Sequence, residues 1–276
     1  MKFCIIAVLL FITSATVAQD KVGVQLYSFR EQLKKDVPGT LEAVAKMGIT
    51  QVEAGATYGL TDSAFKALLD KNQLTAISIG ADYKEIETNI LGVMARAKLY
   101  GAKYVMCSWI PHKETAFTLE DANKALVVFN TAGRILKENG ISLCYHAHGY
   151  EFVPYEKETL FDYMAVRMYP AYVNFEMDVF WIKHAGQDPV ALLKKYRDRF
   201  PLMHLKDRKI GTTGNEFGRA DVETNVVLGT GDVGIEAIYK IARKWGVKYL
   251  FIEDESSRSM EQVPQSMTYL KTFDKK

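Results

Sequence analysis

Four apolar segments in the second half of the chain end in side chains that can bind a metal ion or move a proton. Their endings read His146-Ala147-His148, Glu176-Met177-Asp178, His204-Leu205-Lys206-Asp207 and Glu253-Asp254-Glu255. An unpaired charge buried in apolar surroundings is costly, so such groups require a cation or a dense set of hydrogen bonds. Four endings of this kind in succession therefore predict a binding site.

The alternation of side chains along a strand narrows the choice of ligands. Residues two apart share a face, so each segment can direct one ligand towards a common point. The predicted ligands are His146, Asp178, His204 and Glu253. Imidazole and carboxylate groups without a thiolate suit Mn, Co, Fe, Zn or Mg. We expect one divalent ion of this group, and the residues do not specify which one.

A repeated unit of helix, glycine and strand indicates the scaffold. Gly48, Gly101, Gly140 and Gly246 each follow a segment with helical spacing and precede an apolar run. Glycine commonly ends a helix in the left-handed conformation, and continuous apolar runs are typical of strands buried on both faces. The whole chain yields eight predicted strands, at 22–29, 51–55, 75–80, 104–109, 142–148, 173–180, 201–207 and 249–254.

Predicted helices alternate with these strands, at 38–47, 62–71, 84–100, 119–139, 159–168, 189–198, 233–245 and 260–272. Eight alternations predict a single-domain α/β fold, the (β/α)8 TIM barrel, in which the site lies at the carboxyl ends of the strands. An open doubly wound sheet is the structural alternative. Such sheets usually place a glycine-rich phosphate turn after the first strand, and residues 25–30 contain no glycine.

Other groups near the predicted strand ends are candidates for substrate binding. They combine polar side chains with aromatic faces that suit sugar rings, and comprise Gln25, Glu53, Trp109, Glu151 and Trp181. Packing in the barrel would use the same residue types, so both interpretations stay open. The glycine-rich segment 228–234 predicts a turn in which Asp232 begins the next helix, with an anion pocket as the alternative.

Residues 1–18 have the features of an export signal. Lys2 precedes an apolar stretch, and Thr16-Val17-Ala18 forms a cleavage site before Gln19. The stretch is too short to anchor the protein in a bilayer. We therefore expect a secreted or periplasmic protein with no membrane attachment after cleavage, whose barrel domain spans 19–276. The two cysteines that follow the signal, Cys107 and Cys144, could pair in an oxidising compartment. Both lie in apolar strand-like runs, which favours buried free thiols.

The chain resembles the sugar phosphate isomerase/epimerase family of xylose isomerase-like TIM barrels. The resemblance spans essentially the whole mature chain, and its most specific segments are 145–152, 175–178, 204–207 and 228–232. It implies a divalent metal held by His146, Asp178, His204 and Glu253. The ketose epimerases of the family have a glutamate at the position of His146. This departure leaves His148 and Glu151 open as alternative ligands or bases.

The resemblance implies an enzyme that isomerises or epimerises a ketose or keto-sugar through an enediolate. Glu253 or a histidine of the 146/148 pair would remove the proton, and Lys206 would stabilise the oxyanion. Elimination from the same intermediate would make the protein a lyase or dehydratase, with 3-keto-glycosides as substrates. Export favours unphosphorylated sugars in either case.

Two further classes of function are distinguishable from these enzymes. A nuclease requires a clustered basic face, whereas the net charge is only +2, so we expect no nucleic-acid partner. A non-catalytic sugar-binding protein would bind its ligand without exchanging ligand protons with solvent. Nothing in the sequence indicates an oligomeric state.

Overall fold

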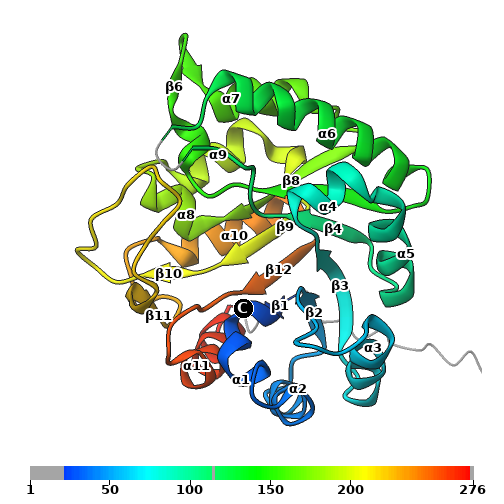
Figure 1. The fold of residues 1–276 in the computed structure, drawn as a ribbon. Coiled ribbons are helices and arrows are strands. Elements are labelled where there is room, and N and C mark those ends of the chain that lie inside the picture. The colour runs from blue at the N-terminus through cyan, green and yellow to red at the C-terminus, as the bar shows by residue number, and fades with distance from the viewer. Residues whose placement is uncertain (1–21, 114–115, 274–276) are drawn as a thin grey trace, which may run out of the picture.

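The computed structural model describes residues 22–113 and 116–273, and within them eight parallel strands close into a barrel (Figure 1). Around the barrel the order is β1, β12, β9, β8, β5, β4, β3, β2. The strands are β1 (Val22–Gln25), β2 (Gln51–Ala54), β3 (Thr75–Gly80), β4 (Tyr104–Cys107), β5 (Ser142–His146), β8 (Val173–Asp178), β9 (Leu202–Leu205) and β12 (Tyr249–Ile252). The predicted TIM barrel is confirmed.

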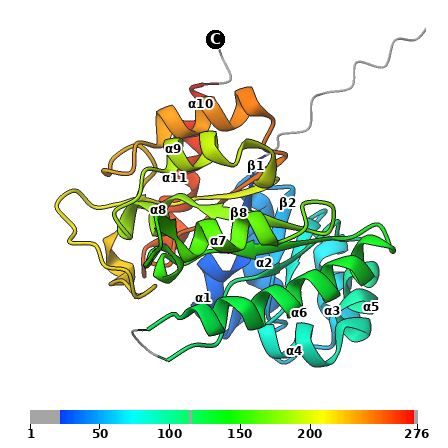
Figure 2. The ribbon, with the colours of Figure 1, turned by 90° about the horizontal axis from the view of Figure 1, so that it is seen from above.

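Helices lie around the outside of this barrel, as two perpendicular views show (Figure 1, Figure 2). They are α1 (Arg30–Leu33), α2 (Val37–Lys46), α3 (Asp62–Lys71), α4 (Tyr83–Thr88), α5 (Ile90–Tyr100), α6 (Leu119–Lys137), α7 (Leu160–Arg167), α8 (Val179–His184), α9 (Pro189–Lys195), α10 (Ile235–Trp245) and α11 (Ser259–Lys271). The single helix predicted over 84–100 is two helices, because the Asn89 side chain caps a new helix by accepting from Gly92 N.

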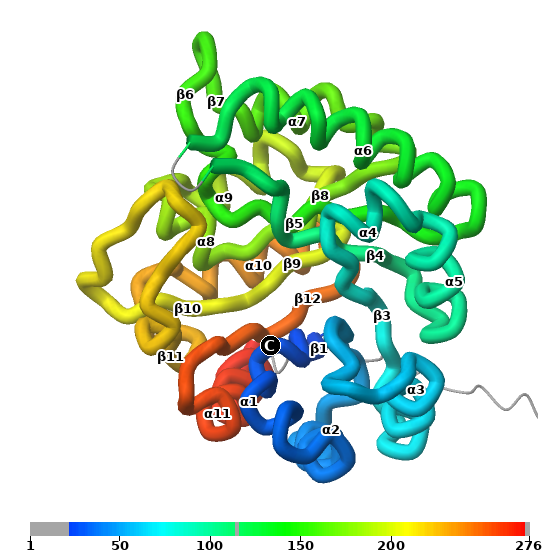
Figure 3. Tube along the Cα trace, viewed as in Figure 1, coloured from blue at the N-terminus to red at the C-terminus, as the bar shows by residue number. Residues whose placement is uncertain are grey.

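Two short antiparallel pairs extend the basic barrel. β6 (Pro154–Tyr155) and β7 (Glu158–Thr159) form a hairpin that projects from the outer layer (Figure 3). β10 (Asp207–Arg208) pairs with β11 (Asn225–Val226) and closes the long connection after β9. Both pairs therefore belong to connections, and the eight barrel strands keep an uninterrupted parallel order.

The four repeated glycines end helices as predicted. Gly48, Gly101, Gly140 and Gly246 have φ of 81°, 68°, 75° and 79°. These are left-handed conformations that disfavour residues with a Cβ atom. Each glycine turns the chain from a helix into the next barrel strand.

Most of the core lies between strands and helices, and a smaller cluster fills the barrel itself. Ile77, Tyr104, Cys144, Leu202 and Phe251 form this inner cluster. Cys144 is therefore inside the barrel, whereas Cys107 belongs to the outer core. Both are free and buried, as predicted, and burial raises the pKa of each thiol, to about 12 for Cys107.

The first barrel strand is shorter than predicted. It ends at Gln25, whose side chain accepts a hydrogen bond from Tyr27 N at 3.1 Å, and residues Leu26–Phe29 form a 3-10 helix. Tyr27 consequently leaves the strand and is 49% exposed. The predicted signal, residues 1–18, lies outside the described residues, so export stays a prediction. Over residues 22–113 and 116–273, no helix combines the length and apolar character needed to cross a membrane.

Candidate active site

A cavity of about 1230 Å³ lies at the carboxyl ends of the barrel strands. Its lining includes seven of the residues singled out from the sequence, namely Gln25, Trp109, His146, His148, Trp181, His204 and Glu253. Asp178 lies directly against this group, because it contacts both His146 and His204. The barrel therefore brings the predicted metal ligands to one place at its mouth.

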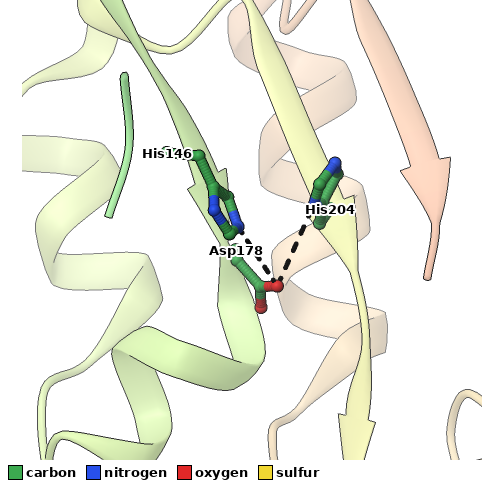
Figure 4. A group of neighbouring side chains, drawn as sticks. All are labelled: His146, Asp178 and His204. Carbon is green, nitrogen blue, oxygen red and sulfur yellow. Dashed lines mark hydrogen bonds and ion pairs between the residues drawn. The ribbon is translucent and has the colours of Figure 1, made fainter. Parts of the chain in front are cut away.

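The four predicted ligands converge around one point from four adjacent strands. Potential ligand atoms of His146, Asp178 and His204 all lie within 4.8 Å of one another (Figure 4). Asp178 Oδ2 is 3.4 Å from His146 Nε2 and 3.8 Å from His204 Nδ1. Glu253 Oε2 is 3.3 Å from the same atom, His204 Nδ1. We call these four residues the metal cluster, because they are the metal ligands predicted from the sequence.

The two oxygens of Asp178 have different surroundings. Oδ1 accepts hydrogen bonds from the backbone N–H groups of Phe180 (2.8 Å) and Trp181 (3.2 Å), and so caps α8. Oδ2 faces the two imidazoles. The start of α8 thus orients the carboxylate and leaves one oxygen available to a ligand in the cluster.

Charge within the metal cluster suits a divalent cation. Burial alone would raise the pKa of Asp178, but Lys206 and the two imidazoles hold it well below its usual value. Burial would also raise the pKa of Glu253, but Lys206 and His204 lower it to about 2. His204 Nδ1 is buried without a hydrogen-bond partner among the described residues. Burial would lower the pKa of His204, but Glu176 and Glu253 raise it well above its usual value, so a metal ion would displace the proton of the ring as it binds. Two ionised carboxylates and two imidazoles form a mixed N/O donor set that fits such an ion.

A second pair of carboxylates lies on the other side of the His204 ring, inside the barrel. His204 Nε2 is 2.9 Å from Glu53 Oε1 and 3.2 Å from Glu176 Oε1. Gln25 Nε2 donates to the same oxygen of Glu53 at 2.5 Å. An N–H donated to a carboxylate fixes the orientation of an imidazole and leaves its other nitrogen to bind metal. Burial and Glu53 raise the pKa of Glu176 to about 7.

This arrangement revises the role expected for Glu53. The side chain is fully buried and does not line the cavity, so it supports His204 where the sequence suggested a contact with substrate. Glu176 was not among the predicted site residues. Its signal was present, since it shares a strand face with Asp178, two residues away.

Lys206 provides a buried positive charge beside the metal cluster. It is 1% exposed, and its Nζ lies 3.3 Å from Glu253 Oε2 and in close contact with the Glu255 carboxylate. The ammonium group also lies 5.2 Å and 5.3 Å from the ring centres of Phe180 and Trp181. Burial would lower the pKa of Lys206, but the carboxylates raise it above the usual value. The side chain is therefore cationic.

His148 lies at the edge of the metal cluster and lines the cavity. Its ring centre is 4.4 Å from that of His146, 5.1 Å from Trp181 and 5.6 Å from Trp109. Burial and His146 lower the pKa of His148 well below its usual value, so the imidazole is neutral. A neutral imidazole in a cavity can accept a proton.

Glu151 holds the backbone of His148 and does not line the cavity. Its carboxylate accepts from the backbone N–H groups of His148 (3.2 Å) and Gly149 (2.8 Å) and from the hydroxyl of Tyr145. The side chain is fully buried. The substrate contact predicted for Glu151 is therefore replaced by a structural one, which holds the backbone that carries His148.

Comparison with known proteins identifies the family. The model of the xylose isomerase-like TIM barrel family matches residues 41–273. The chain belongs to this family. A sugar phosphate isomerase/epimerase from Parabacteroides distasonis ATCC 8503 is 26% identical, with a TM-score of 0.74 over 93% of this chain and 97% of that one.

Two other members of the comparison differ more in sequence. An inosose dehydratase of Klebsiella pneumoniae subsp. pneumoniae is 23% identical over 246 residues, 79% of this chain and 82% of its own length. The IolI protein, whose crystal structure contains a zinc atom, is 14% identical with a TM-score of 0.69 and covers 92% of this chain. The latter similarity concerns the fold.

In this xylose isomerase-like barrel, the glycine-rich segment 228–234 holds an internal carboxylate. Asp207 accepts from Gly229 N (2.8 Å), Gly231 N (3.0 Å) and Val233 N (3.2 Å). The predicted helix start at Asp232 is wrong, because Asp232 forms a two-point ion pair with Arg208 at 2.9 Å and α10 begins after Gly234. Asp207 therefore occupies the place of the external anion that we considered from the sequence.

Proposed function

We propose that the protein is a divalent metal-dependent enzyme that enolises a sugar-like ketone and then expels a substituent from the β carbon. This reaction makes it a lyase or dehydratase. The observation that carries the proposal is the convergence of His146, Asp178, His204 and Glu253 beside the buried Lys206. The relatives named inosose dehydratase support elimination as the outcome.

The metal cluster would hold the ion. When bound there, a divalent metal supplies Lewis acidity that polarises a carbonyl and its neighbouring hydroxyl. The donor set fits Zn, Mn, Co, Fe or Mg, and the zinc in the IolI structure is consistent with this range. Glu53 and Glu176 hold His204 in the orientation that presents Nδ1 to the cluster.

The residues around the cluster can perform the proton transfers. His148 removes the proton from the carbon next to the carbonyl, and the electron pair of that bond forms a carbon–carbon double bond. Lys206 is buried and does not line the cavity, so its Nζ contributes a positive charge behind Glu253 and Glu255 that favours the negative charge developing on the carbonyl oxygen. The carbonyl then re-forms, the bond from the β carbon to its oxygen substituent breaks, and the departing oxygen takes the proton from His148. The products are an unsaturated ketone and water or an alcohol.

The role of base falls to His148 on geometric grounds. Glu253 was the other candidate, and its carboxylate already accepts a hydrogen bond from Lys206 Nζ at 3.3 Å. His148 lines the cavity, and its Nδ1 has no hydrogen-bond partner among the described residues. Glu253 therefore suits metal binding, and His148 suits proton transfer.

Isomerisation or epimerisation is the second candidate outcome. The sugar phosphate isomerase/epimerase of Parabacteroides distasonis supports it, since that protein matches most of the chain. The same proton removal would start the reaction, and return of the proton to another carbon or to the other face would complete it. The two outcomes differ only after the enolate has formed.

Deuterium incorporation tests the enolisation step. The metal-loaded protein is incubated in heavy water with ketoses, inososes and 3-keto-glycosides, and NMR follows exchange next to the carbonyl and any new vinyl signal. We expect exchange with loss of the β substituent, and neither signal in the Asp178→Ala and Glu253→Ala variants. Exchange without elimination favours the isomerase, and a protein that binds no divalent metal refutes both candidates. A sugar-binding protein without catalysis would bind ligand and show no exchange.

A further inference from the structure

The cavity extends well beyond the metal cluster, over the ends of β2 and β3. Its lining there is formed by the small residues Ala54, Gly55, Ala56, Gly80 and Ala81, which we call the small-residue floor. Gly55 is exposed, and a Cβ atom added to it would meet no other atom within 4 Å. The chain thus leaves open space where larger side chains could have filled it.

Aromatic and polar groups surround this floor. Tyr27 and Tyr58 both line the cavity, and Tyr27 is 49% exposed. Burial and the nearby Tyr27 raise the pKa of Tyr58 to about 12, so its hydroxyl remains a hydrogen-bond donor. Arg96 and Glu85 form a two-point ion pair at 2.6 and 2.7 Å at the outer end. Aromatic faces with a few polar groups are the usual lining of sites for small polar molecules.

The volume is larger than one sugar ring requires. Pockets that enclose drug-sized ligands measure about 300–1,000 Å³. The present cavity measures about 1230 Å³, and its lining continues from the metal cluster to the small-residue floor. A single ring bound at the cluster would leave the small-residue floor filled with water.

We propose that the small-residue floor binds the second ring of a two-ring substrate, a glycoside whose keto ring reaches the metal cluster. The inference rests on the proposed function for the identity of the reacting ring. The binding preference for two rings follows from the cavity alone. A second ring that displaces water from the floor adds contacts which a one-ring ketone cannot make.

The Gly55→Leu variant tests the proposal by filling the floor. Gly55 does not have a positive φ, so a side chain is tolerated by the backbone, and Gly55→Ala is the matched control. Binding of cellobiose and glucose, neither of which is a ketone of the proposed reaction, is measured by ligand-observed NMR on the metal-loaded protein. We expect cellobiose to bind at least about tenfold more tightly than glucose to the wild type and to Gly55→Ala, and the preference to disappear in Gly55→Leu.

A second variant protects this test against a failure to fold. Ala56→Leu places the same bulk at the adjacent exposed position and should have the same effect. Equal affinities for the two sugars in the wild type, no measurable binding of either, or an equal loss of both in the leucine variants would overturn the inference. Preference for cellobiose without deuterium exchange on any ketone would refute the proposed function and leave the two-ring site standing. Deuterium exchange on a ketone without a preference for cellobiose would refute the two-ring site and leave the proposed function standing.

Discussion

The two halves of the barrel mouth differ in how they use charge. The half formed by β5, β8, β9 and β12 buries ionised groups almost completely, with Asp178 at 0%, His204 at 1% and Lys206 at 1% exposure. The half formed by β1 to β4 also buries Glu53, a carboxylate that contacts His204, but this side chain does not line the cavity. The lining of this half consists of small residues and the partly exposed pair of Arg96 and Glu85, with side chains 23% and 25% exposed. Desolvated charges interact strongly and are expensive to maintain, so a protein keeps them where chemistry occurs. The open half is suited to selecting ligands by size.

The largest expected effect comes from removing a ligand in the charged half. Asp178→Asn keeps an oxygen that can cap α8 through Phe180 N and Trp181 N, but it replaces the carboxylate that faces the imidazoles. Even residues that only support a ligand change metal affinity by about 10–100-fold, so loss of a ligand should weaken it by more than about 100-fold. Isothermal titration with Mn²⁺ and Zn²⁺ measures this, and activity should fall in parallel.

The cap provides the control for this variant. Thermal unfolding of Asp178→Asn should stay close to that of the metal-free wild type, because the start of α8 is preserved. Wild-type metal affinity in Asp178→Asn would contradict the assignment of the charged half as a metal site.

Removal of the buried cation tests the same half in a different way. Lys206→Met keeps the length of the side chain against Phe180 and Trp181 but leaves Glu253 and Glu255 without their cation. We expect kcat to fall by about 10²–10³-fold, as for the loss of a group that stabilises an oxyanion. The free energy of unfolding should fall by about 3–5 kcal/mol, because breaking a buried ion pair leaves uncompensated charge.

The amount of bound metal distinguishes a role of Lys206 in the reaction from a role in holding the metal ligands in place. The metal bound per folded Lys206→Met molecule should equal that of the wild type, measured by elemental analysis after gel filtration. Loss of the metal together with activity would show that Lys206 maintains the cluster and would remove it from the proposed chemistry.

The carboxylates below His204 should have a smaller effect. Glu176→Gln and Glu53→Gln each replace a carboxyl group that faces His204 Nε2 while keeping the size of the side chain. Metal affinity should fall by about 10–100-fold in either variant. Competition with a chelator of known affinity measures the change. Unaltered affinity in both variants would indicate that packing alone orients His204.

The sequence could predict that the four residues of the metal cluster meet at one rim, because barrel topology requires little further information. Parallel strands deliver their carboxyl ends to one rim, and alternation selects His146, Asp178, His204 and Glu253 from the polar endings. The depth of each residue along the barrel axis was not predictable. Glu53 lies below the rim where β2 and β3 shift register between Val52 and Glu53, a feature that depends on tertiary packing.

Local hydrogen bonds explain the other differences between expectation and structure. The Gln25 side chain ends β1 early by accepting from Tyr27 N, and Asn89 divides one helical segment in two. Polar side chains that hydrogen-bond to nearby backbone groups can end a strand or begin a new helix in this way. The spacing of apolar residues does not reveal such bonds. The sequence did not predict the small-residue floor either. Gly55 and Ala56 indicate a loop, but they do not indicate the open space above it.

The smallest expected effect lies in the open half and completes the comparison. Arg96→Met removes the cation of the Glu85 pair, as Lys206→Met does in the charged half. Arg96 also donates to Gly80 O at 3.1 Å, so some packing of the floor depends on it. Partly exposed ion pairs contribute little, and we expect the free energy of unfolding, measured with urea, to fall by about 1 kcal/mol. An equal loss in Arg96→Met and Lys206→Met would show that burial does not separate the two halves.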